Sequence, residues 1–452
     1  MKRLAYRSGR LIIFILIAAT GTGLIAAAEA PSSTLIQNVR IWDGTADSLT
    51  GSMNLLVEGK LITRVSSDVI KAPAGARVID GANRVLMPGL IDMHQHLAIT
   101  HGMPDMRNNT DWMYNGALAG AQAHKMLLRG FTTVRDIGGP TIGLARVIDE
   151  GRIPGPRIYS SGAFISQTSG HGDMRNYNDP HPNITGELHI MDRLGWGYLA
   201  DGPTEVTRAV REVLRSGATQ LKLMAGGGVA SYFDPIETIQ YTPEELRAAV
   251  TAAANYDTYV AVHAYTDAAI RQALEAGVMS IDHGMLMEEA TMKLMAEKGA
   301  FLSPQVFIFS GGLELDWFTD ENRRKLAQVS AGLDNEMKLA KKHNVKIVFG
   351  TDMFQEELWA KQNLELGMRL KWFTSVEVLR QATSTAAELL SLCNTRNPYK
   401  DGPLGVIQEG AYADFLIVDG DPVKDVRVLE DPAGNMKVIM KDGIVYKNTL
   451  AN

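Results

Sequence analysis

Two histidines separated by one residue, His94 and His96, end the segment formed by residues 88–96. Alternate side chains of a β-strand point to the same face, so both imidazoles can reach one cation. Further ionisable residues stand within or at the ends of apolar, strand-like runs: Lys222, His263, His283 and Asp352. Imidazole nitrogens and carboxylate oxygens are common ligands of divalent metals. Together these residues predict a metal site that activates water for hydrolysis.

The lysine of this set, Lys222, lies inside the apolar run 220–224. A buried ammonium group is costly, so the pKa of Lys222 should fall and the neutral amine should become available. A neutral amine can react with carbon dioxide to form an anionic oxygen ligand, which two divalent cations would stabilise. The alternative is that Lys222 pairs with an acidic neighbour.

Positioning such residues requires strands that end at one face of the fold. Residues 88–402 alternate apolar strand-like runs with amphipathic stretches. The expected strands are 89–94, 131–136, 157–161, 220–224, 260–263, 280–283, 301–304 and 347–352. The expected helices are 115–129, 204–216, 242–255, 268–276, 288–298, 321–343 and 377–392. This alternation predicts an α/β fold, a (β/α)8 TIM-like barrel, whose strand ends meet at the catalytic face.

Two other regions complete this organisation. Residues 164–201 show little apolar periodicity and follow the third expected strand, so we expect them to lie over the mouth of the barrel. Residues 31–87 and 403–452 consist of short alternating runs separated by Gly and Asp turns. Each end supplies only a few strands. We therefore predict one small β-sandwich domain built from both chain ends.

The N-terminal segment has the features of a secretory signal peptide. Lys2, Arg3, Arg7 and Arg10 precede an apolar stretch that continues into small residues. We predict a signal peptide over residues 1–28, and an exported protein that is periplasmic or secreted; an uncleaved membrane anchor is the alternative. The single cysteine, Cys393, allows no internal disulfide and is expected to be buried.

Composition excludes one class of partner. The chain has 452 residues, with 45 Lys and Arg against 51 Asp and Glu, for a formal net charge of −6. This mild acidity, without basic runs, argues against nucleic acid as a partner. Hydrophobic residues make up 45% of the chain, which is typical of a globular protein with a substantial core.

The order of the ionisable residues resembles the amidohydrolase superfamily, and the resemblance covers nearly the whole chain after the signal peptide. In the binuclear branch it implies two divalent metal ions, usually zinc, bridged by a carboxylated lysine. The implied ligands are His94, His96 and Asp352 for the first metal, His263 and His283 for the second, and N6-carboxylated Lys222 as the bridge. Asp352 would also be the general base, unless it acts as a ligand only. Octameric relatives imply a homo-oligomer.

Deaminases of the superfamily carry a glutamate shortly after the histidine that corresponds to His263, and none is found here. The segment 224–235 instead resembles Xaa-Pro dipeptidases, carboxypeptidases and ochratoxin-hydrolysing amidases. These cleave an amide next to a free carboxylate, which His171 and Tyr232 are expected to bind.

The prediction is thus a binuclear metal-dependent amidohydrolase. Its expected substrates are dipeptides, Xaa-Pro peptides, N-acyl amino acids or ochratoxin-like amides. The alternatives are a hydrolase of cyclic amides or imidazolones and a catalytically inactive binding relative.

Overall fold

The computed structural model describes residues 33–102, 105–106, 110–313 and 315–450. The predicted signal peptide, residues 1–28, lies outside the described residues. Within the described ranges, no helix combines the length and the apolar character that crossing a bilayer requires.

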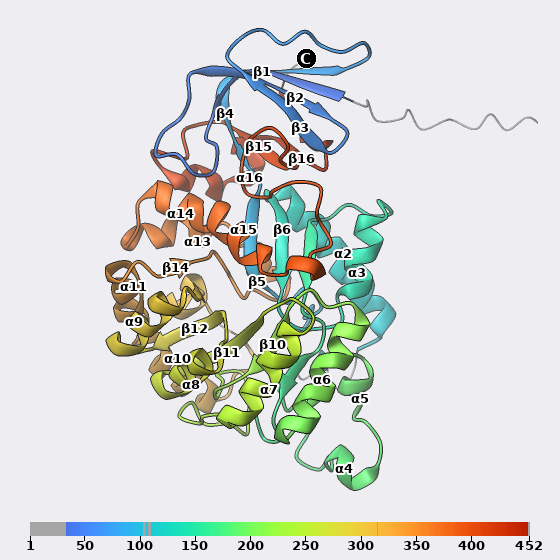
Figure 1. Ribbon diagram of the computed structural model, residues 1–452, viewed down its shortest axis with the longest axis vertical. Coiled ribbons are helices and arrows are strands. Elements are labelled where there is room, and N and C mark those ends of the chain that lie inside the picture. Colours follow the sequence, from blue (N-terminus) through green and yellow to red (C-terminus); the bar gives the residue numbers. More distant parts are fainter. Residues whose placement is uncertain (1–32, 103–104, 107–109, 314, 451–452) are drawn as a thin grey trace, which may run out of the picture.

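The middle of the chain forms a closed barrel of parallel strands (Figure 1). One set of strands pairs in the order β5, β6, β7: β5 (Leu90–Gln95), β6 (Phe131–Asp136) and β7 (Arg157–Ser160). The other set runs from β10 to β14: β10 (Leu221–Met224), β11 (Val260–Thr266), β12 (Ser280–Leu286), β13 (Phe301–Ser303) and β14 (Lys346–Ile347). The backbone bonds Thr219 N to Ser160 O, 2.9 Å, and Met93 N to Phe349 O, 2.8 Å, join the two sets. The predicted (β/α)8 barrel is confirmed.

Two strands of the barrel differ from the prediction. The third is split, because β7 ends at Ser160 and β8 (Phe164–Ser166) takes its place beside β10. The eighth pairs as a regular strand only over β14, although residues 348–352 were expected to continue it. These residues bond to β5 instead, for example from Asp352 N to His94 O at 2.8 Å. This contact brings Asp352 beside the His-x-His strand.

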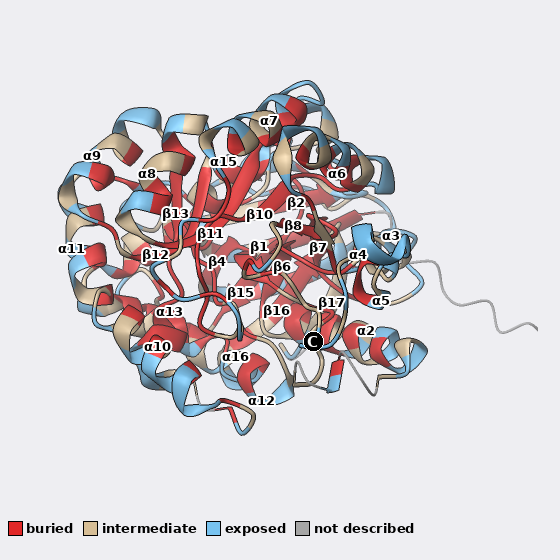
Figure 2. Ribbon diagram, turned by 90° about the horizontal axis from the view of Figure 1, so that it is seen from below, coloured by how far each residue is buried: buried red, intermediate tan, exposed pale blue. Residues whose placement is uncertain are grey.

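Helices surround the strands with their exposed faces outward (Figure 2). They are α2 (Trp112–Leu128), α3 (Ile142–Asp149), α6 (Gly202–Ser216), α7 (Pro243–Ala254), α8 (Asp267–Ala276), α9 (Glu289–Lys298), α10 (Asp320–Ser330), α11 (Leu333–Lys342), α14 (Ser375–Gln381) and α15 (Ser384–Ser391). The expected helices 321–343 and 377–392 are each two helices, and α3 was not predicted. At the first break, Gly332 lies so close to Met285 O on β12 that a Cβ would come within 2.0 Å.

The insertion 164–201 contains more regular structure than its sequence indicates. It holds β8, the short helices α4 (Pro182–Thr185) and α5 (Ile190–Arg193), and β9 (Gly197–Leu199), which pairs with β8. Phe164 and Trp196 from this insertion line the main cavity of the barrel. The expectation that the insertion covers the mouth therefore fits the structure.

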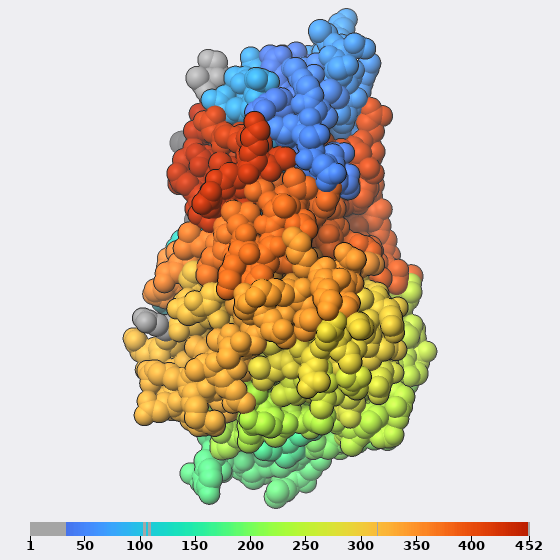
Figure 3. Space-filling model, turned by 90° about the vertical axis from the view of Figure 1, so that its left-hand side faces the viewer, coloured from blue at the N-terminus to red at the C-terminus, as the bar shows by residue number. Residues whose placement is uncertain are grey.

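Both chain ends join in a separate seven-stranded sheet at one end of the molecule (Figures 1 and 3). Its order is β17 (Ile444–Asn448), β16 (Met436–Lys441), β15 (Phe415–Val418), β4 (Arg77–Pro88), β1 (Ser33–Ile41), β2 (Ser52–Glu58) and β3 (Leu61–Ser66). Residues from both ends share one apolar core, among them Ile36, Ile62 and Phe415. Cys393 is fully buried beneath the barrel, as expected.

A buried arginine joins the barrel to this sheet. Arg157, at the start of β7, donates through Nε to Asp414 Oδ2 at 2.9 Å and through Nη2 to Asp442. Its guanidinium carbon lies 3.9 Å from the ring centre of Tyr412. Both Arg157 and Asp414 are almost inaccessible to solvent, so each charge depends on the other.

The Arg157→Ala variant should lose about 3–5 kcal/mol of unfolding free energy, because Asp414 would stay buried without its counter-charge. Urea denaturation followed by circular dichroism measures this loss. The control is Arg152→Ala, which removes an exposed arginine paired with Glu150 and should leave the midpoint nearly unchanged. Equal midpoints for both variants would contradict this role of Arg157.

Candidate active site

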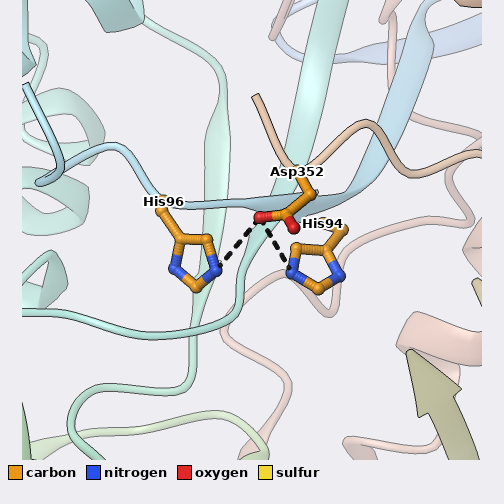
Figure 4. Close-up of side chains that lie close together, drawn as sticks. All are labelled: His94, His96 and Asp352. Atoms are coloured by element: carbon orange, nitrogen blue, oxygen red, sulfur yellow. Dashed lines mark ion pairs between the residues drawn. The ribbon is translucent and has the colours of Figure 1, made fainter. Parts of the chain in front are cut away.

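Three side chains meet where β5 ends beside the segment that follows β14 (Figure 4). His94 Nε2 lies 3.4 Å from Asp352 Oδ1, and His96 Nε2 lies 3.5 Å from the same oxygen. One donor atom from each residue lies within 4.8 Å of the others. In the described part of the chain, this is the one group of three or more metal-ligating side chains with such spacing.

The remaining histidines of the predicted set stand next to this group. The ring centres of His94 and His283 are 5.2 Å apart, and those of His283 and His263 are 4.6 Å apart. His171 stacks on His263, with ring centres separated by 4.1 Å and planes inclined by 18°. The structure therefore brings all these imidazoles into one contiguous cluster.

The second nitrogen of several rings is held by the protein, as is usual for metal-binding histidines. His96 Nδ1 lies 3.0 Å from Gly138 O, and His94 Nδ1 lies 3.5 Å from Asp282 Oδ1. His263 Nε2 lies 3.1 Å from Gly227 O. The Nε2 atoms of His94 and His96 are thus left to face Asp352 at the centre.

Electrostatics keep these rings neutral. Burial lowers the pKa of His94 to about 3 and that of His96 to about 4. It also lowers the pKa of His263 and His283 well below the ordinary value. Neutral imidazoles have a free lone pair, which a metal ion requires. His283 Nδ1 is buried and has no hydrogen-bond partner among the described residues, so this donor set fits divalent cations.

Unusual backbone angles place two of these residues. His283 has φ of 76° and Asp352 has φ of 52°, in the left-handed region that residues other than glycine rarely adopt. Regular alternation along β12 would send Asp282 and His283 to opposite faces. The turn at His283 lets Asp282 point into the barrel while His283 lines the cavity. Such strained positions cluster at functional sites.

Beneath the histidines, one carboxylate neutralises two buried cations. Asp282 Oδ2 lies 2.5 Å from Lys222 Nζ, and Asp282 Oδ1 lies 2.7 Å from Arg135 Nη2. Burial opposes ionisation of Asp282, but Lys222 and Arg135 hold its pKa well below the ordinary value. Burial lowers the pKa of Lys222, although Asp282 opposes that shift. Lys222 thus pairs with an acidic neighbour, Asp282, which is the alternative that the sequence analysis names.

The sequence analysis assigns no role to Asp282 or Arg135. The available signal was weak: Asp282 directly precedes His283, and Arg135 is a charged residue inside the apolar run 131–136. Only the fold shows that these two side chains, from β6 and β12, meet in the barrel interior.

Comparison with known proteins identifies the family. A family model described as the amidohydrolase family matches residues 85–445. The chain belongs to the amidohydrolase family. Ochratoxinase of Aspergillus niger is 31% identical over 450 residues, covering 94% of this chain and 88% of that protein.

Solved structures agree with this assignment. The crystal structure of another amidohydrolase is 36% identical with a TM-score of 0.85, covering 93% of this chain and 100% of that chain. A prolidase whose structure was solved in complex with N-methylphosphonate-L-proline is 34% identical in sequence, with a TM-score of 0.85. The match covers 92% of this chain and 100% of that chain. This amidohydrolase is a hydrolase of amide bonds.

All eight candidate residues of the amidohydrolase line one cavity, which has a volume of about 150 Å³. They are His94, His96, His171, Lys222, Tyr232, His263, His283 and Asp352. Aromatic side chains make up much of the remaining wall, including Phe164, Trp196, Phe233 and Trp317. The centre is therefore placed inside a largely apolar, solvent-connected cavity, as expected for small organic substrates.

The two candidate substrate-binding residues, His171 and Tyr232, differ in how deeply they are buried in the wall of the cavity. His171 is half-buried and its Nδ1 lies 2.8 Å from Ser231 Oγ, whereas Tyr232 is 45% exposed at the cavity wall. The nearby Arg175 donates through Nη2 to Asp173 Oδ2 at 2.6 Å, so its charge is already neutralised. Asp173 itself lines the cavity.

The Asp282→Asn variant should lose about 3–5 kcal/mol of unfolding free energy, because Lys222 and Arg135 would remain buried without a counter-charge. The urea midpoint measures the loss. Asp47→Asn is the control, since Asp47 is exposed where it pairs with Arg380. If Asp282→Asn unfolds at the wild-type midpoint, the two cations do not depend on this carboxylate.

Proposed function

We propose that this amidohydrolase is a binuclear metal-dependent enzyme that hydrolyses an amide or peptide bond next to a free carboxylate. The observation that carries the proposal is the convergence of His94, His96, His263, His283, Lys222 and Asp352 on one cavity. Similarity to ochratoxinase and to a prolidase supports dipeptides, Xaa-Pro peptides, N-acyl amino acids and ochratoxin-like amides as the substrate class.

Two groups of residues would hold the metals. His94, His96 and Asp352 would hold the first, and His263 and His283 the second. Lys222, carboxylated on Nζ, would bridge them after exchanging its contact with Asp282. Divalent cations, for which we propose zinc, would lower the pKa of a water molecule and polarise the scissile carbonyl.

Asp352 is the proposed general base. Burial raises the pKa of its carboxyl to about 8, although Lys222 opposes the rise. A group of this kind can accept a proton from water and later return it to the leaving nitrogen. The contacts with His94 and His96 hold the Asp352 carboxylate at the centre of the site.

His171 and Tyr232 are the proposed substrate-binding residues. Ser231 and the stacked ring of His263 fix the imidazole of His171, which can donate to the substrate carbonyl or carboxylate. The phenol of Tyr232 stands farther out on the same cavity and can donate to the carboxylate or the developing oxyanion.

Export and self-association remain proposals that rest on sequence. The features of residues 1–28 support a periplasmic or secreted protein. The homo-oligomer rests on the family resemblance.

The Lys222→Ala variant tests the bridge. We expect purified wild-type protein to contain about two metal equivalents per chain by plasma mass spectrometry, and the variant to contain one or none, with kcat at least about 100-fold lower. Lys346→Ala, which removes an exposed lysine paired with Glu388, is the matched control. Wild-type metal content and activity in Lys222→Ala would refute the binuclear assignment.

A substrate panel tests the bond and its neighbour. We expect hydrolysis of Xaa-Pro dipeptides or N-acyl amino acids, and at least tenfold lower kcat/KM when the carboxylate is replaced by a carboxamide, because a charge-assisted hydrogen bond is lost. Hydantoin and imidazolone rings serve as competing substrates. Exclusive ring opening would replace the proposed substrate class with that of cyclic amides.

A further inference from the structure

A second pocket opens on the same centre as the main cavity. Its cavity volume is about 60 Å³, and it shares His171, His263, His283 and Asp352 with the main cavity. Its distinct wall is largely apolar, with the Tyr265 phenol as its one hydroxyl group, and is formed by Val229, Tyr265, Ile308, Phe309, Leu313, Phe318 and Leu326. These seven residues define what we call the side pocket.

The side pocket differs from the main cavity in charge. Among the described residues that line it, Asp352 is the one carboxylate, and none is a lysine or arginine. The ring centre of Phe309 lies 5.8 Å from that of His283, so the apolar wall begins at the catalytic histidines. Tyr232 and Lys222 line the main cavity but not the side pocket.

The wall is built by a distorted turn and one helix. The π-helical turn η1 (Ile308–Gly312) carries Ile308 and Phe309, and Gly311 within it has φ of 90°. Gly312 lies so close to Phe307 O that a Cβ would come within 2.5 Å. Short π-helical segments occur frequently at functional sites. Leu326 of α10 is half-buried and lines the side pocket.

The apolar space of the side pocket is suited to binding an apolar group. Protein interiors are close-packed, and an unfilled apolar cavity costs stability in proportion to its volume. A carboxylate would lose more solvation there than an apolar group, because the side pocket has no lysine or arginine and Tyr265 is its one hydroxyl donor. An apolar group of the substrate would be favourable.

We propose that the side pocket binds an apolar acyl side chain of the substrate, while the half that carries the carboxylate lies in the main cavity with His171 and Tyr232. This inference rests on the proposed function and narrows its substrates to N-acyl amino acids and dipeptides with a bulky apolar acyl half. The scissile amide then lies between the two spaces, at the histidines that both share.

Leu326→Trp tests the assignment by filling the side pocket. N-acetyl-L-phenylalanine and N-(3-phenylpropanoyl)-L-phenylalanine share a leaving amino acid and differ in the acyl group. We expect wild-type kcat/KM to favour the larger acyl group and the ratio between the substrates to fall at least about tenfold in Leu326→Trp. Leu294→Trp, a half-buried leucine of α9 away from both spaces, should keep the wild-type ratio.

Leu326→Ala gives the complementary measurement and guards against misfolding of the tryptophan variant. It should raise kcat/KM for N-(4-phenylbutanoyl)-L-phenylalanine relative to the 3-phenylpropanoyl substrate, because it enlarges the side pocket. Ratios unchanged in both Leu326 variants would overturn the inference and leave the proposed function intact.

If wild-type protein hydrolyses neither these substrates nor the Xaa-Pro dipeptides of the substrate panel, the proposed function fails, and calorimetry with the carboxylic acids then tests the side pocket separately. At least about tenfold weaker binding of 3-phenylpropanoate by Leu326→Trp, with acetate bound equally weakly by both proteins, would support the side pocket. Equal binding of 3-phenylpropanoate by both proteins would overturn it.

Discussion

Parallel strands that close into a barrel bring their carboxyl ends to one face, and the candidate ligands of this chain stand at those ends. His94 and His96 come from the end of β5, Lys222 from β10, and His263 and His283 from β11 and β12. Barrel closure adds Asp352, whose backbone N–H bonds to His94 O. A barrel that failed to close between β5 and the segment after β14 would separate Asp352 from both histidines, and the first group of ligands would not exist.

A second constraint lies just below that face. Lys222 and Arg135 enter an interior that excludes water, and Asp282 is the carboxylate that makes both charges tolerable. The same carboxylate lies near His94 Nδ1, which links the charged cluster to the candidate metal ligands. Carboxylation of Lys222 would put a negative group where a positive one now contacts Asp282. The proposed metals would supply the compensating positive charge.

Much of this architecture could be predicted from sequence because the signals are strong and periodic. Apolar runs that end in ionisable residues predicted the barrel strands. Because strand ends of a barrel meet at one face, they also predicted that Lys222 and the histidines lie close together. The split of the third strand at Ser160 could not be predicted, since runs as short as β7 and β8 have no distinctive pattern. The break near Gly332 depends on close contact with β12, a tertiary feature without a local signature.

The site shows the same division. Residue types indicated which side chains would gather, whereas the roles of Asp282 and Arg135 depend on contacts between strands distant in sequence. The left-handed φ at His283 also could not be predicted from the sequence, because histidine has no strong preference for this backbone conformation. Side pocket and main cavity share one set of histidines, so catalysis and the proposed substrate preference depend on the same strand ends.

The central claim is that the strand ends hold two metals bridged through Lys222. Anomalous X-ray diffraction at the zinc edge, from crystals grown with zinc and bicarbonate, tests it most directly. The account predicts two peaks, one among His94, His96 and Asp352 and one beside His263 and His283, with density for a carbamate on Lys222 Nζ. A single peak at His94, His96 and Asp352, with unmodified Lys222 still paired to Asp282, would contradict it.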